Sequence, residues 1–160
     1  MEIERKFLVE EKNLPPLSEY PSHELEQGYL CVDPVVRIRR SDEDYYMTYK
    51  SRGLLSREEY NLPLTKEGYE HLKEKVDGIL IRKIRYLIPE KDGLTIELDV
   101  YDAPYQGFYT AEVEFESEEQ AEGYEPPAWF GEDVTGLGRY QNSSLSQGIP
   151  EEIMGKKAVE

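Results

Sequence analysis

The sequence predicts a mainly β fold of the α+β class, in which eight antiparallel strands can close into a barrel with a few helices packed outside. Apolar and polar residues alternate with a period of two over eight segments, which is the pattern of half-buried β-strands. Turn signals such as Asp33-Pro34 and Lys91-Asp92-Gly93 separate several segments, and short connections favour antiparallel pairing. A chain of 160 residues fits one domain, which we expect over 1–150, with a mobile tail at 151–160.

Each predicted strand carries apolar side chains on one face and charged or polar side chains on the other. In the first strand, Ile3 and Phe7 oppose Glu2, Glu4 and Lys6. Successive residues of a strand point to opposite faces, so this spacing gathers each class of side chain on one side. The strands expected in chain order are 2–9, 25–32, 35–41, 44–51, 55–62, 79–88, 94–102 and 108–116.

Three segments predict helices. Thr65 is a suitable N-cap for a helix over about 66–76, whose apolar residues share one face. Ser117 begins a capping-box pattern for a shorter helix that runs toward Tyr124. A last short helix is expected over 140–146.

The charged faces of the strands are sorted by sign. Acidic residues dominate 2–9, 94–102 and 108–116, whereas basic residues dominate 35–41 and 79–88. A sheet whose charged face is simply solvated would also show such alternation. If the strands close into a barrel with the apolar face outward, the charged face lines the interior. Charges crowded there need partners or a ligand.

A ligand that matches both signs is a polyanion carried with a divalent metal. Carboxylates two residues apart on a strand can share one Mg²⁺ or Mn²⁺, since both ions prefer oxygen ligands. Lys and Arg at the same spacing can neutralise phosphate oxygens, and Arg can bind two oxygens at once. The charge pattern therefore favours a metal–polyphosphate site, while the solvated face stays open as the alternative.

Composition argues against several common function classes. The chain has 19 Lys and Arg against 34 Asp and Glu, and a net charge of −15 argues against nucleic acid or anionic membranes as partners. The single cysteine, Cys31, excludes an internal disulfide, and neither common phosphate-loop motif occurs. We find no apolar run of transmembrane length and no signal peptide, so we expect a cytoplasmic protein without membrane contact.

An ordered series of charged motifs runs through the predicted strands. It begins with Glu2-Ile3-Glu4-Arg5-Lys6 and continues with Val36-Arg37-Ile38-Arg39, Lys83-Ile84-Arg85-Tyr86 and Glu112-Val113-Glu114-Phe115. This series resembles the CYTH family, also called triphosphate tunnel metalloenzymes, whose signature is ExExK. The similarity covers nearly the whole chain and is closest to short bacterial inorganic triphosphatases. It implies an eight-stranded antiparallel barrel that encloses a charged tunnel.

The resemblance also implies roles for individual residues. The four residues implied to hold Mg²⁺ or Mn²⁺ are Glu2, Glu4, Glu112 and Glu114. The cations implied to bind the triphosphate are Lys6, Arg37, Arg39, Lys50, Arg57, Lys83 and Arg85. The residues implied to act in catalysis are Lys6, Glu59 and Asp99, the two acids as groups that orient water or a second metal. Asn61 stands where family members often carry a further acid.

The predicted function is divalent-metal-dependent hydrolysis of inorganic tripolyphosphate to pyrophosphate and phosphate. Three alternatives stay open on the same barrel. Two are other enzymes, an adenylate cyclase and a thiamine triphosphatase, and the third is a non-catalytic barrel that binds polyphosphate or nucleotide. The expected partner is the triphosphate substrate, and a homodimer is possible.

Overall fold

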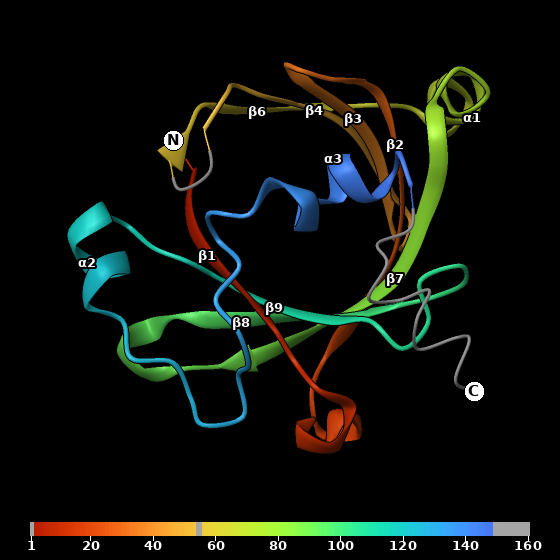
Figure 1. Ribbon diagram of the computed structural model, residues 1–160. Coiled ribbons are helices and arrows are strands. Elements are labelled where there is room, and N and C mark those ends of the chain that lie inside the picture. The colour runs from red at the N-terminus through yellow and green to blue at the C-terminus, as the bar shows by residue number, and fades with distance from the viewer. Residues whose placement is uncertain (1, 54–55, 149–160) are drawn as a thin grey trace.

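The computed structural model describes residues 2–53 and 56–148, which fold around one antiparallel sheet (Figure 1). The predicted tail at 151–160 lies outside these residues. The strands are β1 (Glu2–Leu8), β2 (Ser22–Val32), β3 (Val35–Ser41), β4 (Asp44–Lys50), β5 (Ser56–Arg57), β6 (Glu59–Pro63), β7 (Asp77–Pro89), β8 (Thr95–Tyr101) and β9 (Tyr109–Glu114). The α-helices are α1 (Lys66–Lys73), α2 (Glu118–Gly123) and α3 (Asn142–Leu145), and the 3₁₀ helices are η1 (Glu11–Asn13), η2 (Leu17–Glu19), η3 (Lys91–Gly93) and η4 (Gly138–Tyr140).

The sheet forms a nearly closed barrel. Its strand order is β5-β1-β9-β8-β7-β2-β3-β4-β6, so β5 and β6 occupy the two ends of the order. These two strands follow each other in the chain, and one pairs with β1 while the other pairs with β4. The strand predicted over 55–62 is therefore two short strands interrupted at Glu58, and residue 55 lies outside the described ranges. Glu58 bonds instead through its backbone to both the backbone and the hydroxyl of Ser51.

Two helices cover the outside of the barrel, as expected. α1 packs against β3 and β4, and α2 packs against β1. The Thr65 side chain accepts a hydrogen bond from the Gly68 backbone N–H, and Ser117 caps α2 in the same way through Gln120. The buried carboxylate of Glu26 on β2 attaches α1 by accepting from Tyr69. None of the helices in the described ranges is long and apolar enough to cross a membrane.

The apolar residues form two separate clusters. One lies on the outer face of the sheet under α2 and includes Phe7, Leu98 and Val113. The other combines barrel residues with residues of the chain that follows β9, and its members are Tyr29, Val35, Ile81, Tyr101, Tyr105, Phe108, Val134, Tyr140 and Leu145. The predicted outward packing of the apolar face therefore describes only part of the core.

α3 lies within the ring of strands and not outside it (Figure 1). The Ile79 backbone N–H donates to the Ser146 carbonyl at 2.7 Å, and the Tyr105 hydroxyl donates to the Leu145 carbonyl at 2.6 Å. Gly78 permits this approach, because a Cβ there would lie 2.1 Å from the Ser146 oxygen and its φ is +69°. The end of the chain that follows β9 thus closes part of the barrel interior.

Candidate functional site

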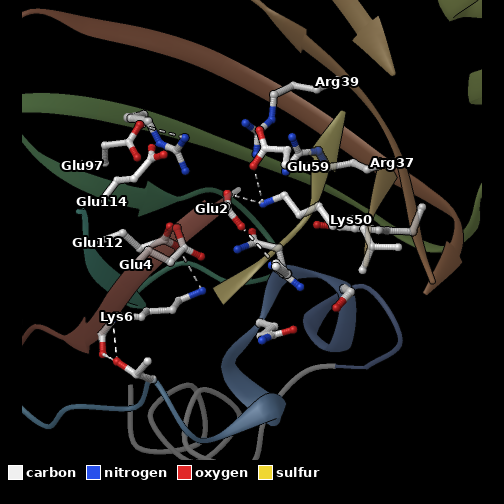
Figure 2. A pocket seen from close by; sticks show the side chains of 18 of the residues that line it. Glu2, Glu4, Lys6, Arg37, Arg39, Lys50, Glu59, Glu97, Glu112 and Glu114 are labelled. Atoms are coloured by element: carbon white, nitrogen blue, oxygen red, sulfur yellow. Dashed lines mark hydrogen bonds and ion pairs between the residues drawn. The ribbon is translucent and has the colours of Figure 1, made fainter. Parts of the chain in front are cut away.

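A cavity of about 270 Å³ occupies the barrel interior (Figure 2). The predicted site residues converge on it, apart from Lys83 and Asp99. Those that line it are Glu2, Glu4, Lys6, Arg37, Arg39, Lys50, Arg57, Glu59, Arg85, Glu112 and Glu114. Strand register explains the convergence: Glu4 pairs with Glu114, Lys6 with Glu112, and Lys50 with Glu59 across neighbouring strands.

The cavity is polarised between its two sides (Figure 2). Glu4, Glu97, Glu112 and Glu114 gather on one side, where Lys6 is also found, while Arg37 and Arg39 lie on the other with Lys50 and Glu59. Such separation is unusual inside a protein, because opposite charges in a low-dielectric interior attract strongly. A charged ligand between the two sides would satisfy both.

The acidic side holds more carboxylates than its cations can neutralise. Burial, together with the neighbouring charges of Glu112 and Glu2, raises the pKa of Glu4 well above its usual value. Burial acts in the same direction on Glu112, but Lys6, 3.4 Å from its Oε1, and Arg85 hold the pKa of Glu112 well below its usual value. The two acids share one hydrogen bond, which raises the pKa of Glu4 further and lowers that of Glu112. A divalent cation would relieve this repulsion.

The centre of the cavity is an ion-pair cluster around Glu2. Its carboxylate accepts from Lys50 Nζ at 2.9 Å and from Arg57 Nε at 3.1 Å. Glu59 lies 3.7 Å from Lys50 and accepts from the Asn61 amide at 2.9 Å. Burial alone would raise the pKa of Glu59, but its hydrogen bond with Glu2 and the charge of Lys50 lower it to about 2. Glu59 is therefore an anion that can orient a donor but hardly accept a proton.

The basic side is not neutralised. Arg37 and Arg39 are 6% and 7% exposed, yet neither forms an ion pair with an acid in the described ranges. Arg37 donates to Thr48 Oγ1 at 3.1 Å, and its Nε is buried without any hydrogen-bond partner. Burial and the charge of Arg39 lower the pKa of Arg37. Two desolvated guanidinium groups that face a cavity and form no direct ion pair in the described ranges are a strong indication of an anion site.

Lys83 and Asp99 lie behind the cavity wall. Lys83 Nζ is 2.6 Å from Asp99 Oδ2, and Asp99 Oδ1 accepts from Arg85 Nε at 2.8 Å. The Lys83 side chain is completely inaccessible to solvent. Burial and the nearby charge of Arg85 lower the pKa of Lys83 to about 7, although Asp99 opposes this. The arrangement presents Arg85 to the cavity and keeps Lys83 away from it.

Sequence reasoning missed several lining residues. Tyr29 and Tyr46 face the cavity from β2 and β4, and Val134, Thr135, Gln141, Asn142 and Ser143 border it from the chain that follows β9. Both tyrosines lie on the same strand face as the charged residues, but an aromatic side chain does not by itself indicate a polyanion site. The other five come from a region without periodicity, so no pattern in the sequence indicated that it enters the barrel.

The carboxylates fit a hard divalent cation in chemistry, since all of them offer oxygen ligands. No three His, Cys, Asp or Glu residues in the described ranges are arranged closely enough to form a finished metal site. The reason lies in the ion pairs, because Glu2 and Glu112 already engage Lys50, Arg57 and Lys6. The acids are suitable ligands, but the binding of metal and anion would have to rearrange these ion pairs.

Comparison with known proteins agrees with the tunnel geometry. The family model described as the CYTH domain matches residues 1–148. The chain belongs to the CYTH family. This confirms the family predicted from the charged motifs, and the nearly closed antiparallel barrel confirms the predicted fold.

Relatives of this CYTH protein align over almost its whole length. It is 41% identical over 152 residues to an inorganic triphosphatase of Nitrosomonas europaea, covering 93% of this chain and 99% of that protein. It is 34% identical over 149 residues to an inorganic triphosphatase of Acetivibrio thermocellus, covering 90% and 92% respectively. A crystal structure of an inorganic triphosphatase is similar with a TM-score of 0.69 and 38% identity, covering 94% of this chain and 97% of that one.

Proposed function

We propose that this CYTH protein hydrolyses inorganic tripolyphosphate to pyrophosphate and phosphate, with Mg²⁺ or Mn²⁺ as its metal. The observation that carries the proposal is the pair Arg37 and Arg39, two buried cations that form no direct ion pair within residues 2–53 and 56–148 and that face a group of carboxylates across one cavity. A polyanion with its metal supplies the missing charge on both sides. Two relatives above 30% identity are named inorganic triphosphatases, which supports the same substrate.

The cations differ in whether they must release a carboxylate before they bind the substrate. Arg37 and Arg39 donate only to the neutral side chains of Thr48 and Gln27, so they can bind phosphate without giving up a carboxylate. Lys6, Lys50 and Arg57 must exchange a carboxylate for the substrate. Arg85 keeps Asp99 and Glu97 as partners and offers only part of its guanidinium. Preorganised cations stabilise the negative charge that develops on the leaving pyrophosphate without further reorganisation.

Carboxylates would hold the metal and orient the attacking water. We propose Glu4, Glu112 and Glu114 as metal ligands, with Glu2 joining them once Lys50 and Arg57 contact phosphate. A bound metal neutralises phosphate charge and lowers the pKa of its water. Glu59, kept anionic, is placed to align a water for in-line attack on a terminal phosphorus, which breaks the bond to the bridging oxygen. Asp99 does not line the cavity, so we assign it the positioning of Arg85.

The test is phosphate release from tripolyphosphate and from ATP, each with Mg²⁺, Mn²⁺ or EDTA. We expect metal-dependent turnover of tripolyphosphate, and a loss of about 10²–10³-fold in kcat for Glu4→Gln. The matched control is Glu43→Gln, which removes one carboxylate from an exposed turn and should leave the rate unchanged. No turnover by wild type with either metal would refute the proposal. Cyclic AMP in the ATP reaction would instead identify a cyclase.

A cytoplasmic location and a homodimer stay predictions. Fractionation of the producing cells tests the first, and light scattering of the purified protein at several concentrations tests the second.

A further inference from the structure

The segment around α3 forms a floor to the cavity. Gln141, Asn142 and Ser143 line the cavity, while Tyr140 and Leu145 pack into the apolar cluster behind them. In Figure 2 the blue ribbon that carries α3 borders the lower side of the cavity. An anion that enters the barrel therefore meets uncharged polar side chains on this side of the cavity.

The amide of Asn142 has a defined orientation. Its Oδ1 accepts from Lys83 Nζ at 3.0 Å and from the Tyr101 hydroxyl at 3.2 Å. Both neighbours donate to this oxygen, so the amide oxygen is the atom that faces Lys83. The Nδ2 group consequently turns the other way, toward the cavity that Asn142 lines. Within the described ranges this Nδ2 donates no hydrogen bond. It is not one of the polar atoms that are buried without a partner, so it is accessible to a ligand.

This geometry explains how an inaccessible cation can contribute to the site. Lys83 cannot touch a ligand in the cavity, because its side chain is fully buried and held by Asp99. The hydrogen bonds that Lys83 and Tyr101 donate to its oxygen polarise the Asn142 amide, which strengthens the two N–H donors on the opposite side. Neighbouring hydrogen bonds of this kind reinforce one another in a low-dielectric interior.

We propose that Asn142 is a substrate-binding residue whose side-chain N–H groups donate to a phosphate group in the cavity, on the side formed by α3. Lys83 and Tyr101 are then positioning residues that orient its amide. The inference rests on the proposed polyphosphate site, and it assigns to Asn142 the contact that the sequence motif suggested for Lys83.

Two substitutions separate this role from a merely structural one. If Asn142 only anchors Lys83 through its oxygen, Asn142→Asp keeps the acceptor and is tolerated, whereas Asn142→Ala is the more harmful change. If Asn142 donates to phosphate, the order reverses, because Asp directs an anion at an anion. We expect tripolyphosphate affinity to fall about ten- to a hundredfold in Asn142→Ala, and about tenfold further in Asn142→Asp.

The measurement is calorimetric titration of inorganic tripolyphosphate in EDTA, where the proposed hydrolysis cannot proceed. Thermal unfolding of each variant is recorded alongside. The matched control is Ser144→Asp, which adds the same charge two residues away on the exposed side of α3 and should bind within about twofold of wild type. If Asn142→Ala unfolds, Tyr101→Phe removes one orienting donor and should weaken binding about two- to tenfold.

Each outcome decides the inference. The inference is supported if affinity falls from wild type to Asn142→Ala and further to Asn142→Asp, while Ser144→Asp binds like wild type. Equal or tighter binding by Asn142→Asp than by Asn142→Ala overturns it, as does a wild-type protein that binds no tripolyphosphate. Wild-type binding without metal-dependent turnover would refute the proposed hydrolysis and leave this inference intact, so the two can fail separately.

Discussion

Replacing Arg37 by Met should make the protein more stable and less active. Arg37 lies buried with an unpartnered Nε and no ion pair in the described ranges, so folding desolvates its charge and returns only the hydrogen bond to Thr48. One unsatisfied buried donor costs about 1–3 kcal/mol, and Met fills a similar volume without that cost. We expect the free energy of unfolding to rise by about 1–3 kcal/mol in Arg37→Met.

Arg85→Met is the matched comparison, for which we expect stability to change in the opposite direction. Arg85 bonds twice to the buried carboxylate of Asp99 and once to Glu97, so its removal leaves a buried anion short of partners. Breaking a buried ion pair costs about 3–5 kcal/mol, and we expect the lower end because Lys83 still contacts Asp99. Both substitutions should reduce tripolyphosphate turnover, since both remove a cation that lines the cavity.

Urea unfolding without ligand measures the two stabilities, and thermal unfolding checks them at about 2–4 °C per kcal/mol. Added tripolyphosphate should raise the melting temperature of wild type but much less that of Arg37→Met, because a ligand stabilises the state that binds it. If Arg37→Met were destabilised as strongly as Arg85→Met, the charge of Arg37 would be compensated in the free protein. The argument for an anion site would then fail.

Two further predictions concern buried acids. Arg85 and Lys83 lower the folded pKa of Asp99 to about 2 despite burial, so its stabilising contribution, about 2–3 kcal/mol, is complete above about pH 4 and lost as the pH falls toward 2. Asp99→Asn should therefore be less stable than wild type at pH 7 by a margin that shrinks on acidification in urea titrations; a constant margin would contradict this. Glu26→Gln should cost about 1–2 kcal/mol, because the carboxylate that contacts Tyr69, Lys73 and Arg82 loses its charge under α1. Faster hydrogen exchange in α1 would locate the effect, and unchanged stability would show that Glu26 does not hold the helix.

Local patterns in the sequence were sufficient for most of the strands. Alternation over 35–41 and 94–102 matches β3 and β8 closely, because each strand has one apolar and one charged face whatever its partners. The caps Thr65 and Ser117 were likewise visible, since a cap acts within its own helix turn. Boundaries were less certain, as β7 begins at Asp77 where the prediction began at 79.

The sequence also predicted that the charged faces converge. Alternation places Glu2, Glu4 and Lys6 on the charged face of one strand, and it places Arg37 and Arg39 on the charged face of another. Alternation does not indicate which groups a side chain contacts on its face of the sheet. Lys83 and Asp99 have the correct parity, but they pair with each other and are covered by the floor. Pairing depends on distances across strands that are far apart in the chain, and no spacing in the sequence reports them.

The sequence by itself determined the alternation of the strands, the two exterior helices and the sorting of charge by strand, since each follows from neighbours within a few residues. Only the tertiary structure decided which charges are neutralised and which are left for a ligand, because neutralisation depends on contacts such as that of Lys50 with Glu2. It also decided that the chain after β9 lines the cavity. The floor at Asn142 exists because the irregular chain after β9 folds into the barrel, and its apolar anchors Tyr140 and Leu145 acquire partners only there.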